Sequence, residues 1–325
     1  MMKTHASALL ALTGIAAALC LSTACNRDQK KVIAVIPKGR AHLFWQSVHA
    51  GAAKAAQENN VNIVWNGPTA ETDYNDQLKI VDAMINRQVD AIALAPIDKK
   101  VMVSVVDRAA SQHIPVVIFD SPVDTDKFIS QVATDNYAAG RLAADRMGLI
   151  LNGKGKICMV MVQPGAASTM AREQGFEDEL KKKFPAIEIV DRRYGEADFA
   201  KSLQISENML TAHPDLAGMF ASNESSTVGA ARALKGRTGS TVKLVGFDSG
   251  PSLEAGLRDG LIDSLVVQNP FKMGYESVEA AVKALKGEQV TKINNLAPRL
   301  VLREDLDKPD VKEQLNPDLK KYLKD

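Results

Sequence analysis

The sequence VIAVI occupies residues 32–36, and the polar segment PKGRAH follows it directly at residues 37–42. Five consecutive apolar residues, four of them β-branched, predict a strand that is buried on both faces. An amphipathic stretch from Phe44 to Asn59 then predicts a helix. A buried strand followed by a helix is half of a βαβ unit, in which right-handed crossovers join parallel strands.

The same pattern recurs at a spacing of roughly 25 to 30 residues, the length of a strand plus a helix. A first series of expected strands comprises residues 32–36, 61–65, 91–95 and 115–119. A second series begins after residue 155 and comprises residues 156–161, 187–190, 216–220, 242–247 and 264–267. Two series of similar length predict an α/β protein with two lobes, each a doubly wound parallel sheet.

Composition narrows the function classes. Charged residues make up 24% of the chain and the net charge is +1, so no excess of one sign favours nucleic acid as a partner. No Gly-x-Gly-x-x-Gly follows the first strand, and no Ser/His/Asp or metal-ligand pattern occurs. We therefore expect a protein that is not an enzyme and that uses no cofactor and no metal. Cys158, in an apolar run, is expected to be a buried small side chain.

The N-terminal residues predict export and anchoring. Lys3 precedes an apolar run at residues 8–21, and small residues precede Cys25, so residues 1–24 are expected to be a cleaved signal peptide. The segment resembles the lipobox of bacterial lipoproteins, although Leu21 lies four rather than three positions before the cysteine. We expect lipidation of Cys25, a linker at residues 25–30, and a membrane-anchored lipoprotein in the periplasm or cell envelope.

Polar residues follow the ends of the expected strands, where open parallel sheets bind ligands. They include Lys38, His42, Asp120, Asn223, Asp248 and Gln268. Carboxylates and amides pair well with hydroxyl groups, which both donate and accept hydrogen bonds. Phe44 and Trp45 offer a flat surface for the C–H face of a sugar. The pattern therefore predicts a sugar site in a cleft between two lobes.

Several motifs, taken in order, resemble the ribose-type periplasmic sugar-binding proteins of ABC transporters over residues 31–302. This family is related in fold to the ligand domain of lactose-repressor-type regulators. The motifs are FW at 44–45 before GA at 51–52, PVVIFD at 115–120, ATDN at 133–136, Arg172 before GF at 175–176, LTAHPD at 210–215, NE at 223–224, VGFD at 245–248 and Gln268 before Pro270.

The resemblance implies the type I periplasmic binding protein fold, with two doubly wound parallel-sheet lobes joined by a three-strand hinge. The N-terminal lobe would comprise residues 31–134 plus 269–297, and the C-terminal lobe residues 135–268 plus 298–325. The hinge crossings would lie near residues 134–136, near residues 268–269 and near Pro298. A hinge of this kind lets the lobes bend without disturbing either core.

Position by position, the resemblance also implies a set of ligand-binding residues. Phe44 and Trp45 would sandwich the ligand, and Asp120 would accept hydroxyl hydrogens. Arg172, Asn223, Asp248 and Gln268 would complete a polar ring from the second lobe. Thr134, Lys38 and His42 complete the predicted set.

The chain also departs from the family pattern. Lys38 and His42 stand where ribose binders have Ser and Asn, and they would suit an acidic or unusually substituted ligand. Ala95 replaces an expected Asn. Ala197 stands in the position of an aromatic residue of the second lobe, with Phe199 two residues later.

Each site residue has a structural alternative. Phe44 or Trp45 could be core, and Asp120 or Asp248 could cap a helix, as we expect of Asp135 and Asn136. Arg172, on an expected helix at residues 168–184, could form an ordinary surface ion pair. His49, His113 and His213 lack metal-like spacing and are expected to be structural. The charged end at residues 303–325 is expected to be a solvated segment with a short helix.

The expected function is that of the substrate-binding component of an ABC-type sugar importer. The protein would act as a monomer, capture a monosaccharide or related polyol by hinge closure, and pass it to a permease. A ligand-presenting sensor for a chemoreceptor or kinase is an alternative, and a Rossmann-type enzyme is a weaker one. A transcription regulator is excluded because the N-terminus is a signal sequence rather than a helix-turn-helix.

Overall fold

The computed structural model describes residues 30–323, and residues 32–325 belong to one compact unit. The predicted signal peptide, the predicted lipidation of Cys25 and most of the predicted linker therefore lie outside the described residues. Between residues 30 and 323, no helix is long and apolar enough to cross a membrane.

The first lobe is built on a six-stranded, wholly parallel sheet with the strand order β11-β5-β4-β3-β1-β2. Its strands are β1 (Val32–Ile36), β2 (Asn62–Trp65), β3 (Ala91–Leu94), β4 (Val116–Phe119), β5 (Ser130–Thr134) and β11 (Ile293–Leu296). Its helices are α2 (Leu43–Glu58), α3 (Tyr74–Asn86), α4 (Val103–Ser111) and α10 (Pro270–Leu285).

The second lobe repeats this plan with the strand order β12-β10-β9-β8-β6-β7. Its strands are β6 (Lys154–Met161), β7 (Ala186–Tyr194), β8 (Leu216–Ala221), β9 (Lys243–Phe247), β10 (Ser264–Val267) and β12 (Arg299–Val301). Its helices are α5 (Asn136–Ile150), α6 (Ala167–Lys183), α7 (Phe199–Ala212), α8 (Glu224–Lys235) and α9 (Pro251–Arg258). The C-terminal segment then forms η1 (Arg303–Asp305), α11 (Pro309–Leu315) and η2 (Leu319–Lys321).

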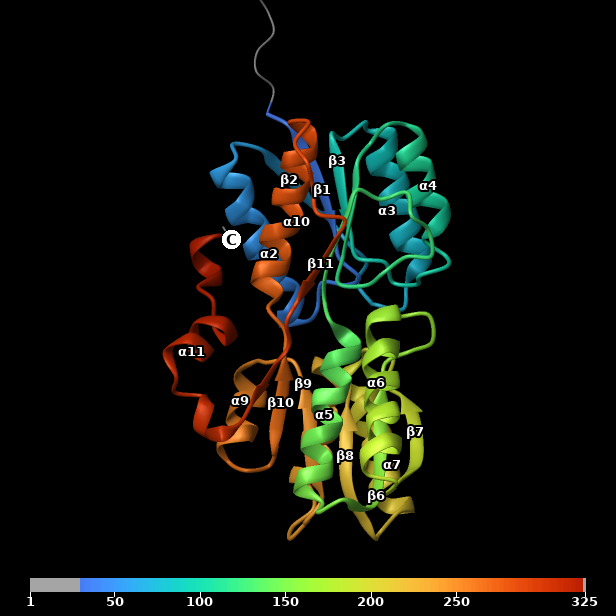
Figure 1. The fold of residues 1–325 in the computed structure, drawn as a ribbon, viewed down its shortest axis with the longest axis vertical. Coiled ribbons are helices and arrows are strands. Elements are labelled where there is room, and N and C mark those ends of the chain that lie inside the picture. Colours follow the sequence, from blue (N-terminus) through green and yellow to red (C-terminus); the bar gives the residue numbers. More distant parts are fainter. Residues whose placement is uncertain (1–29, 324–325) are drawn as a thin grey trace, which may run out of the picture. The chain divides into compact units, whose positions relative to one another are not determined.

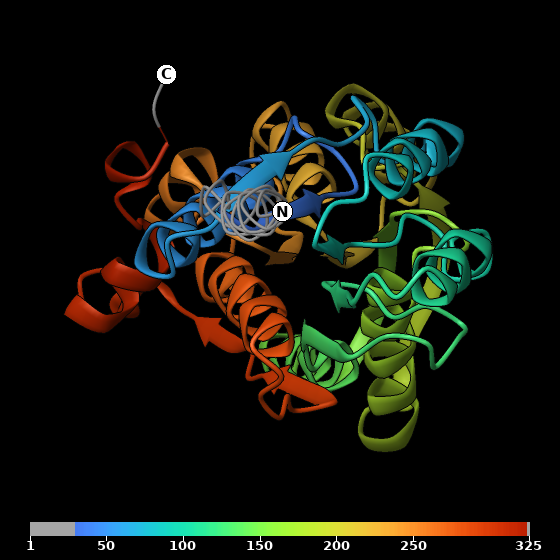
Figure 2. The same ribbon diagram turned by 90° about the horizontal axis from the view of Figure 1, so that it is seen from above.

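Helices cover both faces of each sheet (Figures 1 and 2). Because successive strand residues point to opposite faces, Ile33 and Val35 of β1 pack in one apolar cluster with α2 and α10, whereas Ala34 and Ile36 pack in another with α3 and α4. In the second lobe, α5 and α6 cover one face, and α7, α8, α9 and α11 cover the other. The predicted doubly wound α/β fold is confirmed. So is the burial of Cys158, which has no exposed surface.

The chain passes between the two sheets three times. It leaves β5 at Thr134 and enters α5, whose first turn is capped by the Asp135 side chain, as expected. It returns from β10 through Asn269 into α10, and it crosses again between β11 and β12. A hydrogen bond of 2.7 Å from Thr134 Oγ1 to Gln268 Oε1 ties the first two crossings together.

The second sheet is not wholly parallel, because β12 pairs antiparallel with β10. Only Ala297 and Pro298 separate β11 from β12. A parallel strand would need a long crossover connection, whereas a chain that comes directly from the other sheet can lie antiparallel on the edge.

The expectation of a merely solvated C-terminal segment is wrong, although the expected short helix is present as α11. Leu306, Val311 and Leu315 are buried in the core of the second lobe. The ring of Tyr322 lies 5.6 Å from that of Phe271 on α10, in the first lobe. A few apolar side chains therefore anchor this segment, although most of its residues are charged or polar. The high charge of the segment led to the wrong expectation.

A glycine contact lets two helix pairs approach closely. A Cβ added at Gly51 of α2 would lie 1.9 Å from a backbone carbonyl oxygen of α10, and one at Gly140 of α5 would lie 1.9 Å from the carbonyl oxygen of Arg172 on α6. Gly274 and Gly175 make the reciprocal contacts. In each lobe this pairing fixes the helix that carries site residues, since α2 carries Phe44 and Trp45 and α6 carries Arg172.

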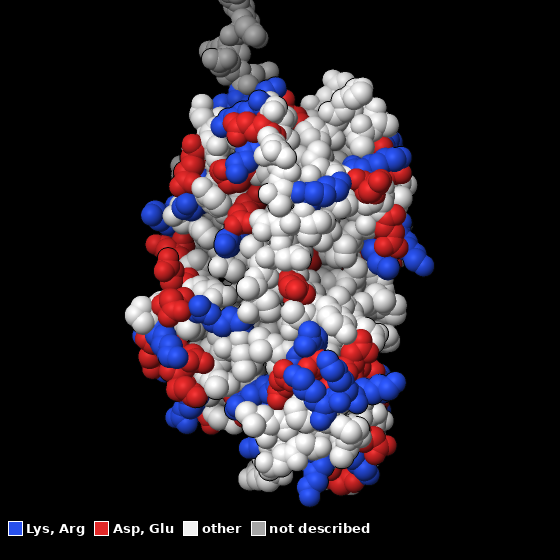
Figure 3. Space-filling model, viewed as in Figure 1, with Lys and Arg blue, Asp and Glu red and all other residues white. Residues whose placement is uncertain are grey.

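Lysine, arginine and acidic side chains alternate over the face shown in Figure 3, as the small net charge of +1 leads one to expect. That face carries no broad area of a single sign (Figure 3). A polyanionic partner would need such an area.

Candidate ligand-binding site

A cavity of about 30 Å³ lies where the carboxyl ends of the two sheets meet. All of the predicted ligand-binding residues except Thr134 line it, and Glu71, Ser168 and Thr169 line it as well. The cavity has roughly the volume that one water molecule occupies in the liquid. Side chains from both lobes are therefore brought together tightly, and a larger ligand requires them to separate.

Phe44 and Trp45 form one wall from the start of α2. Their ring centroids lie 4.8 Å apart at an angle of 90°, an edge-to-face contact. Both side chains belong to an apolar cluster of the first lobe and both also line the cavity, so a place in the core does not exclude contact with a ligand. Trp45 Nε1 donates a hydrogen bond of 2.7 Å to Glu71 Oε1, which fixes the indole ring.

The N-terminus of α2 is capped by the other lobe. His42, at the N-cap position, makes no side-chain capping bond. Instead the Glu224 carboxylate, from the start of α8, accepts hydrogen bonds from the backbone amides of Leu43 and Phe44 at 3.3 and 3.2 Å. A carboxylate is favoured there by the free amides and by the positive end of the helix dipole. Separation of the lobes breaks this cap.

Lys38 and Asp120 form a buried ion pair, with Nζ 2.6 Å from Oδ2. Lys38 also donates to Ser121 Oγ at 2.6 Å and to Ser168 Oγ at 3.0 Å. Because Ser168 belongs to α6, this network joins the two lobes. The Asp120 carboxylate thus engages Lys38 and does not cap a helix, the alternative that the sequence left open.

His42 is held as a cation by acceptors on both sides. Its Nδ1 lies 2.9 Å from the Glu71 carboxylate, and its Nε2 lies 3.0 Å from the carbonyl oxygen of Ala197. Both ring nitrogens must donate to satisfy these acceptors, which only imidazolium can do. Burial alone would lower the pKa of His42, but the carboxylates of Glu71 and Glu224 raise it to about 9.

Ala197 contributes its backbone where the family pattern has an aromatic ring. Its φ of +54° is in the left-handed region, and its carbonyl accepts the bond from His42. The ring of Phe199 meets the His42 ring edge-on at 5.1 Å. Phe199 therefore supports His42 from the side and is not among the residues that line the cavity.

Glu71 is the charged residue lining the cavity that the strand-end pattern missed; Ser168 and Thr169 were missed as well. It lies six residues after the end of β2, in the loop before α3. Burial alone would raise the pKa of Glu71, but the neighbouring His42 cation and the other hydrogen-bond donors lower it to about 2. The rule that ligand-binding residues follow strand ends applies to β2 as well. It did not identify Glu71, because no carboxylate directly follows this strand in the sequence.

Arg172 is buried, with 2% of its surface exposed, so it is not an ordinary surface arginine. Nε donates to Asn136 Oδ1 at 2.7 Å, Nη1 donates to the Ser222 carbonyl at 2.9 Å, and the guanidinium lies 4.0 Å from the centre of the Phe247 ring. No carboxylate in residues 30–323 forms an ion pair with it. Its direct hydrogen bonds therefore go to neutral groups, while the carboxylates of Asp248 and Asp120 act on its charge without forming an ion pair.

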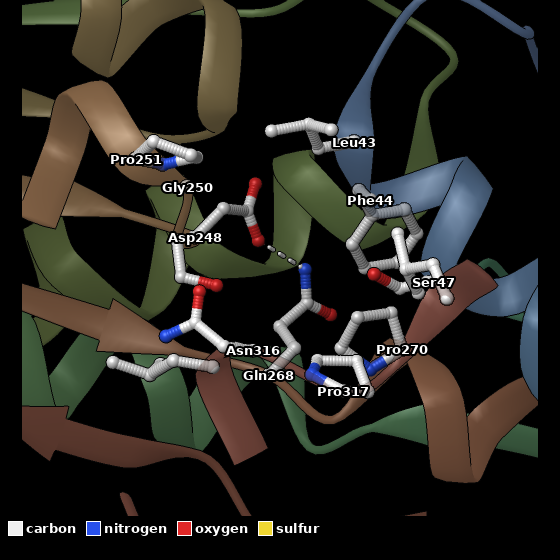
Figure 4. A pocket seen from close by; sticks show the side chains of 13 residues that line it. Leu43, Phe44, Ser47, Asp248, Gly250, Pro251, Gln268, Pro270, Asn316 and Pro317 are labelled. Atoms are coloured by element: carbon white, nitrogen blue, oxygen red, sulfur yellow. Dashed lines mark hydrogen bonds between the residues drawn. The ribbon is translucent and has the colours of Figure 1, made fainter. Parts of the chain in front are cut away.

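Asp248 and Gln268 complete the wall beside Arg172. Gln268 Nε2 donates to Asp248 Oδ1 at 2.8 Å (Figure 4). The Glu224 backbone amide donates to Oδ2 at 2.8 Å. Burial raises the pKa of Asp248, while Arg172 and the two hydrogen bonds oppose that rise. The N-cap of the following helix is Gly250, so Asp248 does not cap it.

The remaining positions behave differently. Asn223 lines the cavity and also caps α8, accepting a hydrogen bond from the Ser226 amide at 3.0 Å. Thr134 does not line the cavity. Its Oγ1 donates a hydrogen bond to Gln268 Oε1 and so orients the Gln268 side chain. Ala95 is buried, and its carbonyl accepts a hydrogen bond of 2.8 Å from Gln77, so it contributes backbone rather than a polar side chain.

The site is chemically suited to a neutral ligand rich in hydroxyl groups. The two cations of the first lobe, Lys38 and His42, are matched by Asp120 and Glu71, which leaves no excess positive charge there for an acidic ligand. In the described part of the chain, no group of three or more His, Cys, Asp or Glu side chains is placed to hold a metal ion.

Comparisons with known proteins agree with this geometry. The family model of the periplasmic binding protein domain matches residues 33–289. The ribose import binding protein RbsB of Escherichia coli strain K12 is 29% identical over 293 residues, which cover 89% of this chain and 96% of that protein.

Two crystal structures are similar over nearly their whole length. A carbohydrate transporter solute binding protein from Agrobacterium radiobacter, in complex with D-arabinose, has a TM-score of 0.86 and 32% identity, and the match covers 88% of this chain and 99% of that one. An ABC transporter solute binding protein from Agrobacterium vitis, with bound D-fucose, has a TM-score of 0.85 and 36% identity, with 87% and 99% covered. The chain therefore belongs to the family of periplasmic binding proteins.

Proposed function

We propose that this protein is the monosaccharide-binding component of an ABC-type sugar importer. One observation carries the proposal: polar side chains from the carboxyl ends of both sheets converge, together with Phe44 and Trp45, on a single cavity. Aromatic surface and paired carboxylate and amide groups are what a monosaccharide needs, since it presents a C–H face and a rim of hydroxyls.

Hinge motion is part of this function. The cavity of about 30 Å³ is smaller than a monosaccharide, so the sugar enters when the lobes are apart. Closure then forms contacts between the lobes: Glu224 caps α2, Lys38 meets Ser168, and the Lys99 amide donates to the Gly165 carbonyl at 3.1 Å. A sugar that contacts both lobes favours the closed state because those contacts do not exist in the open one.

A thermal-shift screen, followed by calorimetry, tests the proposal. D-arabinose and D-fucose come first, because they are bound in similar solute binding proteins, and other pentoses, hexoses and polyols follow. At least one is expected to raise the melting temperature. The absence of a shift with every sugar and polyol, together with turnover of some substrate, contradicts the proposal.

Asp248→Ala tests the site itself. The variant is expected to remain folded and to lose ligand-induced thermal stabilisation, because it removes a buried carboxylate that accepts hydrogen bonds at the cavity wall. Asp215→Ala is the matched control, since Asp215 is exposed and pairs only with Lys156. An unchanged ligand shift in Asp248→Ala removes this residue from the site.

The tether and the lobe boundaries complete the proposal. The signal-like residues 1–24 and the position of Cys25 support a mature protein held to the membrane by lipid on Cys25, and we propose that it acts as a monomer. The lobes comprise residues 31–134 plus 269–297 and residues 135–268 plus 298–325, which agrees with the membership of the two sheets.

Cys25→Ser is expected to release the protein into the soluble periplasmic fraction, and continued membrane association of that variant contradicts lipidation at this position.

A further inference from the structure

A second and larger cavity adjoins the candidate sugar site (Figure 4). Its volume is about 170 Å³, against about 30 Å³ for the cavity between the sheet edges. Phe44, Asp248 and Gln268 line both cavities, so the two share a wall. At about 30 Å³ for each water molecule, the second cavity has room for roughly six non-hydrogen atoms, the number in a six-membered sugar ring without its substituents.

Four segments far apart in the sequence build this second cavity. The start of α2 contributes Ser47, the segment from the end of β9 to the start of α9 contributes Ser249 and Pro251, and the junction of β10 and α10 contributes Gln268 and Pro270. The C-terminal segment closes the cavity with Asn316 and Pro317 (Figure 4). The C-terminal segment is held in place independently, because α11 is buried in the core of the second lobe and Gln314 Nε2 donates to the Gln268 carbonyl at 2.9 Å.

The lining combines apolar faces with unused polar groups. The ring of Phe44 offers a flat π face, and the rings of Pro251 and Pro317 offer C–H surface. Among residues 30–323, no side-chain hydrogen bond engages the half-buried hydroxyls of Ser47 and Ser249. The Asn316 amide nitrogen is occupied by Glu254 at 3.2 Å, which leaves its carbonyl oxygen as an acceptor. This mixture suits a carbohydrate ring better than a purely hydrocarbon group.

We infer that the ligand extends beyond one ring: a monosaccharide unit bound between the sheet edges carries a second sugar unit, which occupies the cavity closed by the C-terminal segment. The inference rests on the proposed function, because it keeps the monosaccharide unit at the proposed site and adds a second sugar unit to it. The hydrogen-bonded side chains of Asp248 and Gln268 separate the cavities. A glycosidic linkage is one oxygen atom wide, so a small displacement of the Gln268 side chain suffices to join them.

Calorimetry on the full-length mature chain tests this inference with two aromatic substitutions on neighbouring residues. Ser47→Phe fills the second cavity from α2, whereas Gln46→Phe places the same ring on the exposed side of that helix. Asn316→Trp, at an exposed position on the opposite wall, is a second filling variant if Ser47→Phe folds poorly. The probes are the monosaccharide that binds best in the screen, its methyl glycosides and its disaccharides.

The inference expects at least one disaccharide to bind within about 10-fold of the free sugar. It also expects Ser47→Phe or Asn316→Trp to weaken that disaccharide at least 10-fold while changing the affinity for the free sugar less than about 3-fold, and Gln46→Phe to change neither. If every disaccharide binds 100-fold more weakly than the free sugar, or if the filling variants weaken both ligands equally, the second subsite is wrong and the proposed function stands. If no carbohydrate binds at all, both are overturned.

Discussion

The two lobes use the same helix pairing but hold their charged site residues in different ways. In the first lobe α2 packs on α10 through Gly51 and Gly274, and in the second α5 packs on α6 through Gly140 and Gly175. The cations of the first lobe, Lys38 and His42, are each matched by a carboxylate.

Arg172 in the second lobe is held instead by an amide oxygen and a backbone carbonyl. A buried cation paired with a carboxylate is largely neutralised, whereas one held by neutral acceptors keeps a charge that a ligand can use. We therefore predict that the first lobe supplies shape and rigidity and that the second supplies the strongest polar contact with a sugar.

Substitution of Arg172 should have the largest effect. Arg172→Met removes the guanidinium while keeping a long side chain, and we expect sugar affinity to fall roughly 1,000-fold, or about 4 kcal/mol, as for other buried charged contacts. Calorimetry measures this change in sugar affinity. Arg192→Met, which removes an exposed arginine paired with Glu177, should leave affinity unchanged. If Arg172→Met still binds sugar within 10-fold of the wild type, the second lobe does not supply the dominant contact.

The glycine contacts allow a direct comparison of the two helix pairs. Gly140→Ala and Gly51→Ala each place a Cβ 1.9 Å from a carbonyl oxygen, and we expect each to lower the free energy of unfolding by about 3 kcal/mol. Only the Gly140 variant displaces the backbone of Arg172 itself, so it should also weaken sugar binding more than Gly51→Ala does.

Urea unfolding and calorimetry measure the two effects of the glycine variants. Gly236→Ala is the control, because the nearest atom to its added Cβ lies 3.5 Å away. Equal loss of sugar affinity in the two helix-pair variants contradicts the special position of Arg172.

The ion pair of His42 should make folding depend on pH. The pKa of His42 is about 9 in the folded chain, against 6.5 for an ordinary histidine. Because the folded value is higher, the stabilisation is fully present below about pH 6.5 and is lost as the pH rises through 9. The expected loss is about 3 kcal/mol.

The effect is measured as the difference in free energy of unfolding between the wild type and His42→Asn, at pH 6.5 and pH 9. This difference cancels the titration of Glu173, whose pKa is raised to about 7 by burial. The contribution of any other group near His42 also cancels, provided that the group titrates in the same way in both proteins. A difference that is constant with pH contradicts the charged state assigned to His42.

A smaller effect is expected where the lobes touch each other away from the ligand. A Cβ at Gly165 would lie 2.0 Å from the Asp98 carboxylate, and Gly165 has a φ of +88°. Gly165→Ala should therefore hinder closure and weaken sugar affinity about 10-fold, or about 1.4 kcal/mol. Gly239→Ala carries a similar φ of +77° with no atom within 4 Å, so it controls for backbone strain. Equal affinities in the two variants show that this contact does not matter for closure.

Most of the strands could be predicted because they are short, continuous apolar runs. The predicted strands at residues 32–36 and 264–267 match β1 and β10 at both ends. β5 (SQVAT) escaped prediction because its sequence is polar although most of it is buried, and β11 (INNL) escaped because it is a polar, largely exposed edge strand. β12 lies on the edge of the second sheet because the connection from β11 is short. Apolar periodicity in the sequence does not show the length of that connection.

The strand-end rule placed the main site residues because it depends on topology alone. It could not supply Glu71, which reaches His42 from a long loop, nor the role of Glu224 as a cap for α2 in the other lobe. These residues meet their partners only because distant parts of the folded chain come into contact. No local sequence pattern indicates which residues will meet in this way.

The sequence by itself determined the two βα series and the polar residues at their strand ends, because apolar periodicity and strand direction are local properties of the chain. Only the tertiary structure decided which charges are paired, that Arg172 is not, and that the C-terminal segment closes a second cavity. Those features depend on distances between residues from 30 to more than 200 positions apart, and they exist only once both lobes have folded and met.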